Sequence, residues 1–122
     1  MSSACHVAIE DDWEAGLMAG SYEAATRGIP LDTDEPIRAT TVDRVQQVLD
    51  DRYRDLQLPL VVVVVELDAL RATGIPVDED PSTGRVRIGG PLPPSDSEII
   101  RAVVPVHRES DRWVAPDLIG VA

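Results

Sequence analysis

Two histidines, one cysteine and a set of arginines are the side chains of this sequence best suited to chemistry. A neutral imidazole takes up and gives off a proton near pH 7, whereas a guanidinium stays charged and only donates hydrogen bonds. His6 is therefore a candidate for proton transfer, and Cys5 beside it would complete a nucleophile pair. The favoured interpretation of Cys5 is a small buried hydrophobic residue near the start of a strand. His107, next to Arg108 and Glu109, is expected on the surface.

The charge of the chain excludes several classes of partner. Its 122 residues include 22 acidic and 11 basic residues, so the formal net charge is -11, and every basic residue is Arg. A strongly acidic domain is repelled by phosphate backbones and by anionic lipids, so we expect neither nucleic-acid binding nor membrane binding. The length is that of one domain, and we expect a single domain over residues 1–122. Oligomeric state is not readable from the sequence.

Neither a metal site nor a targeting segment is expected. The two histidines lie about 100 residues apart and the chain has one Cys, which is no zinc-ligand pattern. The cluster Asp78-Glu79-Asp80 lacks the Gly and the spaced oxygens of a calcium loop. The N-terminus lacks a basic region followed by an apolar stretch, and a lone cysteine fits a reducing compartment. We therefore expect a cytoplasmic protein that works without a metal.

The candidate residues must be positioned by strands and helices, which the hydrophobic pattern predicts. Five consecutive valines in residues 60–66 favour a central strand buried on both faces. Further strands are expected at residues 4–9, 37–39, 76–80, 85–88, 97–107 and 112–115, and helices at residues 11–20, 41–55 and 68–73. Asp11 and Glu14 have the spacing of a capping box for the first helix, which Gly20 would end. Residues 23–36 are predicted to form a loop, and the whole is predicted to be α+β.

A series of weak motifs follows these predicted elements in order. They are His6 on the first strand, Trp13, Ala15, Gly20 and Tyr22 around the first helix, the segment 37–48, the valine-rich strand, Asp68, Leu70, Pro76-Val77, and Gly90-Pro91-Leu92-Pro93. In this order and spacing, over about residues 6–113, the chain resembles the bacterial family called domain of unknown function 952. That resemblance implies a fold similar to ADP-ribosyltransferases, a small domain with a split, curved, mixed or antiparallel sheet and two main helices around a cleft. It implies no established reaction.

The chain departs from the family at two motifs. Arg38 and Arg87 stand where members of the family usually carry histidines, and Gly89 stands where they carry a tyrosine. Arginine suits carboxylate or phosphate through paired donors, so this exchange replaces a proton-transfer or metal site with an anion site. We expect Arg38 and Arg87 to converge with His6 on one cleft and to hold an anionic group. The alternative is that both arginines are exposed strand residues with salt-bridge partners.

The resemblance also implies roles for further residues. His6 and Tyr22 are the candidates for catalysis by proton transfer, while Trp13 and Thr40 join Arg38 and Arg87 as candidates for substrate binding. For His6, Tyr22 and Trp13, a structural role in the core is the open alternative.

Three functions are compatible with these expectations. The first is a small-molecule enzyme that needs no cofactor and carries out a cyclisation or isomerisation on an anionic organic substrate, as in a biosynthetic pathway. The second is NAD-dependent ADP-ribosyl transfer, or binding of NAD or a nucleotide, which the implied fold favours. The third is a non-catalytic binding module whose acidic surface meets a basic partner.

Overall fold

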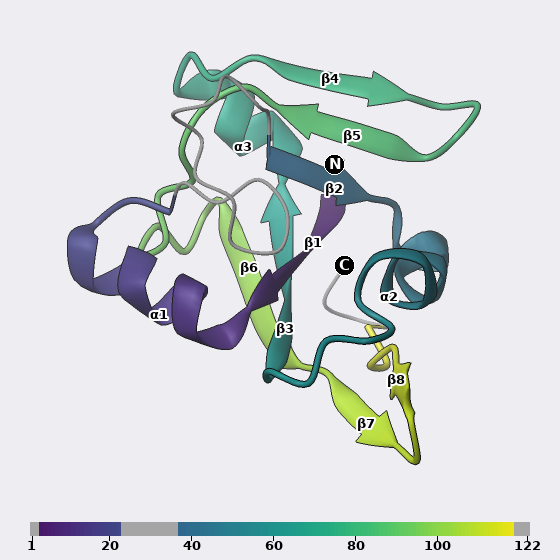
Figure 1. Cartoon of the computed structure of the whole chain (residues 1–122). Coiled ribbons are helices and arrows are strands. Elements are labelled where there is room, and N and C mark those ends of the chain that lie inside the picture. The colour runs from purple at the N-terminus through teal and green to yellow at the C-terminus, as the bar shows by residue number, and fades with distance from the viewer. Residues whose placement is uncertain (1–2, 23–36, 119–122) are drawn as a thin grey trace.

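The computed structural model describes residues 3–22 and 37–118, and its centre is one antiparallel sheet (Figure 1). Six strands pair in the order β4-β5-β2-β1-β3-β6. Their bounds are β1 Ser3–Ile9, β2 Ile37–Thr40, β3 Leu60–Glu66, β4 Val77–Asp80, β5 Arg85–Ile88 and β6 Ile100–Pro105. The α+β prediction is confirmed. The expected loop at residues 23–36 lies outside the described residues.

The valine-rich segment is the central strand that its composition predicts. Every residue of β3 is buried, and the strand lies between β1 and β6. β-branched side chains pack well on a pleated surface, and a strand without alternation fills both faces of a sheet. Val61, Val63 and Val65 join the hydrophobic cluster on one face of the sheet, here called the first face. Val62 and Val64 join the cluster on the opposite, second face.

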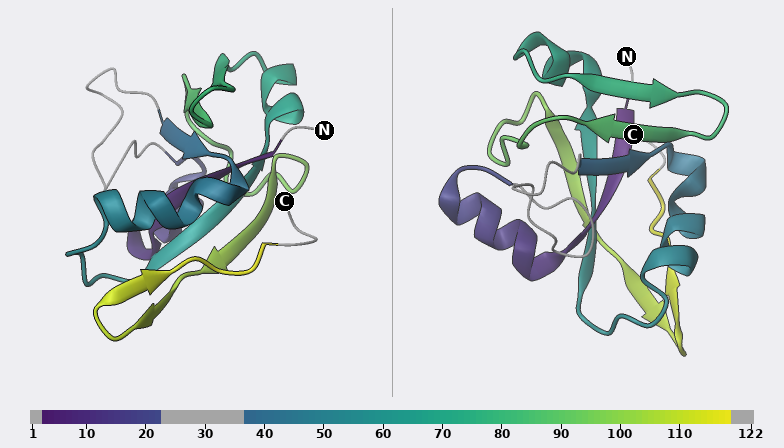
Figure 2. Two further views of the ribbon diagram at one scale, coloured as in Figure 1. Left: turned by 90° about the vertical axis from the view of Figure 1, so that its right-hand side faces the viewer. Right: turned by 45° about the horizontal axis from the view of Figure 1, so that its top comes forward.

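Different helices cover the two faces (Figure 2). Helix α1 (Glu10–Ala19) and the short α3 (Leu67–Ala72) bury Trp13, Leu67 and Leu70 in the first-face cluster. The 3-10 turn η2 (Val42–Arg44) and helix α2 (Val45–Arg52) lie on the second face. There they are joined by a separate hairpin of β7 (His107–Glu109) and β8 (Arg112–Val114). None of the described helices is long and apolar enough to cross a membrane.

Two sequence-based boundaries are wrong for identifiable reasons. Helix α1 begins at Glu10, its N-cap is Ile9, and no side chain caps it, so the predicted capping box at Asp11 and Glu14 does not form. Its end is as expected, because Gly20 takes the left-handed conformation with φ of 82°. Of the expected long strand at residues 97–107, only Ile100–Pro105 forms β6, and residue 107 begins the separate strand β7, since pairing along β3 ends at Pro105. β8 therefore pairs with β7 and not with β6.

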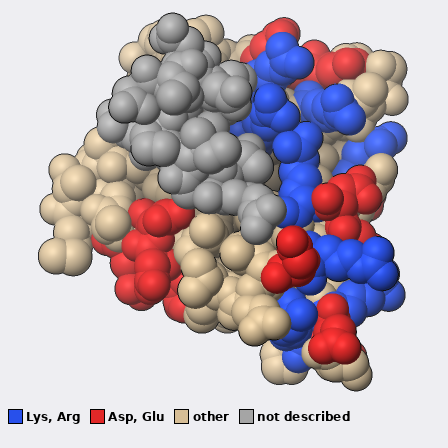
Figure 3. All heavy atoms as spheres, in the orientation of Figure 1, with Lys and Arg blue, Asp and Glu red and all other residues tan. Residues whose placement is uncertain are grey.

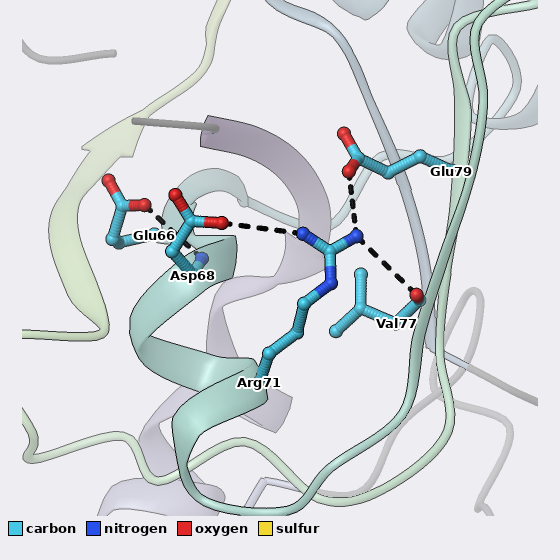
Figure 4. A network of polar contacts seen from close by, with 5 residues as sticks. All are labelled: Glu66, Asp68, Arg71, Val77 and Glu79. Atoms are coloured by element: carbon cyan, nitrogen blue, oxygen red, sulfur yellow. Dashed lines mark hydrogen bonds and ion pairs between the residues drawn. The ribbon is translucent and has the colours of Figure 1, made fainter.

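One polar network ties strand β4 to helix α3 (Figure 4). The Arg71 guanidinium donates to Glu79 Oε2 at 2.7 Å, to the Val77 carbonyl at 3.4 Å and to Asp68 Oδ1 at 3.5 Å. The Glu66 carboxylate accepts a hydrogen bond from the Asp68 amide at the start of α3. These ion pairs are partly exposed, so they contribute little to the stability of the fold. These contacts fix the position of β4 relative to α3. Because β4 pairs with β5, they also help to position β5.

The second hairpin docks against α2 through polar contacts. Gln46 donates to the Trp113 carbonyl and accepts from the Ala115 amide, both at 2.9 Å. Arg112 pairs with Asp50 at 3.1 Å and thereby lowers the pKa of that carboxyl. The Trp113 indole donates to the Leu56 carbonyl at 3.0 Å. Helix α2 is therefore fixed between the sheet and this hairpin.

Candidate functional site

A pocket lies on the second face, between α2 and the strands β1, β2 and β5. Its volume is about 480 Å³. The arginines that line it are Arg38, Arg44, Arg52, Arg85 and Arg87. Asp51 is the one carboxylate among the lining residues that the structure describes. Figure 3 shows arginine side chains gathered on the side of the molecule where β5, β2 and α2 lie. Almost half of the basic residues of the chain thus meet at one pocket.

Alternation along two strands directs three of these arginines into the pocket. Arg38 lies opposite Arg87 in the register of β2 with β5, and Thr40 lies opposite Arg85. The residues between them, Ile37, Ala39, Val86 and Ile88, are buried in the first-face cluster. Because successive side chains of a strand point to opposite faces, the arginines lie on the second face.

Helix α2 supplies the facing wall. Val45, Leu49 and Tyr53 recur every four residues, and all three are buried against the second face of the sheet. Arg44, Val48 and Arg52 follow the same spacing one position earlier and line the pocket. The helical period therefore places an apolar stripe in the core and an arginine-bearing stripe beside it.

Arg44 reaches from η2 to the turn between β4 and β5. Gly84 has φ of +72°, and a Cβ built on it would lie 2.6 Å from Arg44 Cδ and 2.7 Å from its Nε. The Gly84 carbonyl accepts hydrogen bonds from the Thr41 amide at 3.1 Å and from Thr40 Oγ1 at 3.2 Å. Because Gly84 has no side chain, the Arg44 side chain can lie over it, at the residue that precedes Arg85.

Four of the pocket arginines form no ion pair with a carboxylate of the described residues, although Asp43 interacts electrostatically with its neighbour Arg44. Among the described residues, no ion pair within 4.0 Å joins a carboxylate to Arg44, Arg52, Arg85 or Arg87. The acidic strand β4 lies beside β5, with Asp78 opposite Arg87 and Asp80 opposite Arg85 in register. These aspartates moderate the positive potential at the edge of the pocket without pairing directly. Arg38 and Arg87 are exposed strand residues, as the alternative expected, and no described carboxylate forms an ion pair with Arg87.

Cys5 lines the pocket but is not a nucleophile there. Its side chain is buried, and that burial raises the pKa of the thiol to about 11. The thiolate is the reactive form, so a thiol with such a pKa stays protonated and inert near neutral pH. The expectation of a small buried hydrophobic residue agrees with this environment.

His6 and Tyr22 form a buried pair on the first face. His6 Nε2 lies 2.7 Å from the Tyr22 hydroxyl, and His6 Nδ1 lies 2.7 Å from the Arg38 carbonyl oxygen. A carbonyl only accepts, so Nδ1 carries the proton and the Tyr22 hydroxyl donates to Nε2. Gly16 allows this packing, because a Cβ there would lie 3.0 Å from that of Tyr22. Every polar atom of the pair has a partner.

Burial also sets the protonation state of this pair. Desolvation lowers the pKa of His6 to about 4, although the hydrogen bond to the Arg38 carbonyl acts in the opposite direction. Desolvation likewise raises the pKa of Tyr22 above its usual value. Both side chains are therefore neutral near pH 7. They have the properties of a satisfied core pair, the alternative that the sequence left open.

The expected convergence of His6 with Arg38 and Arg87 is wrong. His6 lies between Cys5 and Val7, which belong to the second-face cluster, so its own side chain points to the first face. The carbonyl of Arg38 contacts the imidazole, whereas Arg38 lines the pocket on the second face of the sheet. The structure thus keeps the two arginines together and separates them from the histidine.

The remaining predicted residues divide in the same way. Trp13 is 3% exposed, and its ring packs on Tyr22 with centroids 4.9 Å apart, so it belongs to the first-face core and not to the pocket. Thr40 lines the pocket. Sequence reasoning missed Arg44, Arg52 and Arg85. The alternation of Arg85 with Arg87 along the predicted strand could have indicated Arg85. Arg44 and Arg52 could not be found in this way, because they reach the pocket only through the packing of η2 and α2 on the sheet. No cluster of metal ligands occurs among residues 3–22 and 37–118.

Replacing Tyr22 with Phe tests the structural role of the pair. We expect the variant to lose about 1–3 kcal/mol of unfolding free energy, because the buried Nε2 of His6 loses its donor. Urea unfolding measures this loss. The pocket on the second face should be unaffected, because Tyr22 belongs to the cluster on the first face. Unchanged stability would contradict this structural role.

The fold matches a protein of known structure. Protein CC0527 from Caulobacter crescentus superimposes with a TM-score of 0.69 at 18% identity, covering 96% of this chain and 95% of that one. A double mutant of CC0527 gives the same TM-score and coverage at 15% identity. No family model matches the sequence, and no curated protein sequence matches it. The superposition shows that the chain shares the fold of CC0527. An identity this low carries no conclusion beyond the fold, so the resemblance to domain of unknown function 952 stays a prediction.

Proposed function

We propose that this protein binds an anionic organic small molecule in the pocket between α2 and the sheet. The observation that carries the proposal is the collection of five arginines and one aspartate around a pocket of about 480 Å³. In a chain of net charge -11, the pocket has the opposite sign to the molecule as a whole. Like charges gathered in one pocket repel one another in the free protein, and a bound anion reduces that repulsion.

The lining is suited to an organic anion of small size. Val7, Val48 and Tyr53 provide apolar surface next to the guanidinium groups. Binding pockets typically combine such apolar walls with a few placed polar groups. The Tyr53 hydroxyl donates to the Val7 carbonyl at 3.2 Å, which fixes one of these walls. The apolar surface would receive the body of the ligand and the arginines its charge.

The proposed anion pocket bears differently on the functions expected from the sequence. A reaction that needs no cofactor would draw its charge stabilisation from Arg38 and Arg87, as expected, but His6 and Tyr22 lie on the other face. NAD is one candidate ligand because its pyrophosphate is anionic. No described residue favours a particular reaction, so cyclisation, isomerisation and ADP-ribosyl transfer stay predictions.

A panel of ligands tests the proposal by thermal shift and calorimetry. The panel contains small carboxylates, phosphate esters, NAD and ADP-ribose, with neutral sugars as controls and sodium chloride matched in ionic strength. We expect at least one organic anion to stabilise the protein saturably, by about 2.7 kcal/mol at 100 times its Kd. The proposal fails if no anion does so, or if the chloride control gives an equal shift.

A further inference from the structure

We propose that the pocket recognises a terminal phosphate group, seated on Arg38, Arg85 and Arg87 and completed by Arg44. The inference rests on the proposed function and names the class of its ligand: a phosphomonoester with an apolar body. A carboxylate or an internal pyrophosphate is the competing chemistry.

The spacing of the sheet arginines favours a group with several acceptors. Arg38 and Arg87 are directly opposite in register, which places their Cα atoms roughly 4.5–5.5 Å apart. Arg85 lies two residues along β5 on the same face, roughly 7 Å from Arg87. A carboxylate has two oxygens, and one guanidinium can engage both of them in a paired contact. A terminal phosphate has three oxygens and can accept from all three arginines.

The positive charge of the pocket also favours a phosphomonoester over a carboxylate. Arg38 and Arg87 are like charges in directly opposed positions, an arrangement that destabilises a sheet. Among the lining residues that the structure describes, five are arginines and one is a carboxylate. Asp78 and Asp80 offset part of this excess from strand β4. A phosphomonoester carries a charge close to -2 on one group near pH 7.5, twice that of a carboxylate.

Arg44 provides a donor from the opposite wall. It lies over Gly84, the residue that precedes Arg85, so its side chain extends from η2 toward the sheet arginines. Donors from two elements can surround a tetrahedral group, whereas a planar carboxylate is bound from within its own plane. The apolar surface of Val7 and Val48 then remains for the body of the ligand.

Calorimetry with matched ligands at pH 7.5 tests the inference. The pairs are phenyl phosphate with benzoate, and glycerol 3-phosphate with glycerate, while NAD represents an internal pyrophosphate. We expect at least one phosphomonoester to bind about tenfold or more tightly than its carboxylate partner, because it engages additional charge-assisted hydrogen bonds. Equal affinities within the pairs, or binding of NAD alone, would overturn the phosphate assignment and leave the proposed function standing. If no anion binds at all, both proposals fail.

Two glycine variants test the part played by Arg44. Gly84→Ala and Gly74→Ala both place alanine at a positive φ, +72° and +94°, so both lose stability through backbone strain. Only the Gly84 variant brings a Cβ against Arg44, since nothing lies within 4 Å of a Cβ at Gly74. We expect Gly84→Ala to weaken binding of the phosphomonoester about tenfold or more, the scale of one hydrogen bond to a charged group, and Gly74→Ala to leave it unchanged. Equal affinities of the two variants would remove Arg44 from the site.

Discussion

The double variant Arg38→Gln/Arg87→Gln should bind the anionic ligand at least about 100-fold more weakly than the unchanged protein. Each arginine contributes charge-assisted hydrogen bonds of about 1.5–3 kcal/mol to a bound anion, and about 1.4 kcal/mol corresponds to a factor of ten. The two side chains face the same pocket from opposed positions in β2 and β5, so they act on one group. Isothermal titration with the best ligand of the panel measures the change.

The matched control is Arg101→Gln. Arg101 is exposed on β6 and does not line the pocket, so this variant changes the charge of the chain without touching the site. We expect its affinity to stay within about twofold of the unchanged protein. The single variant Arg87→Gln should unfold within about 0.5 kcal/mol of the unchanged protein, as is usual for an exposed position. Full affinity in the double variant would contradict the arginine site.

The second large effect is a loss of stability in acid that depends on His6. Burial lowers the pKa of the folded-state imidazole to about 4 from an ordinary value of 6.5. Between these two pH values the unfolded chain binds a proton that the folded protein does not, so the free energy of unfolding falls as the pH falls. The contribution is fully present above pH 6.5 and is lost toward pH 4. At about 1.4 kcal/mol for each pKa unit, the loss is about 3 kcal/mol.

Urea unfolding at a series of pH values isolates this contribution. In the His6→Gln variant, the free energy of unfolding should depend less on pH between pH 6.5 and 4. The variant should also be less stable at neutral pH, because the buried hydrogen bonds of His6 change. His107→Gln removes an exposed histidine and should leave the slope unchanged. Carboxylates that titrate in the same range contribute equally to all three proteins. If the slopes with and without His6 coincide, the imidazole is not buried in its neutral form.

Most elements of the fold were predictable because they depend on local patterns. The five valines of β3, the stop at Gly20 and the alternation in residues 85–88 are each visible in short windows of sequence. The start of α1 was not predictable, because β1 continues directly into the helix and leaves no capping side chain. The strand that ends at Pro105 also depended on pairing with β3, which is a long-range property.

The candidate site was predictable only in part. The sequence indicated Arg38, Arg87 and Thr40, and the pocket contains all three. It also joined His6 to them, and this is wrong because adjacent strands can present either set of alternate residues to a given face. The register that pairs Cys5 with Thr40 decides the matter. It places Cys5, and not His6, on the side of the arginines.

The sequence by itself determined an acidic α+β chain in which arginine supplies every fixed positive charge. It also determined which residues alternate together along each strand, because that period is a property of the backbone. Only the tertiary structure decided that β2, β5 and α2 bring five of these arginines to one pocket while His6 and Tyr22 are sealed in the opposite core. The physical reason is that strand register and helix docking are fixed by the burial of apolar side chains distant in sequence, and the charged side chains follow the faces that remain.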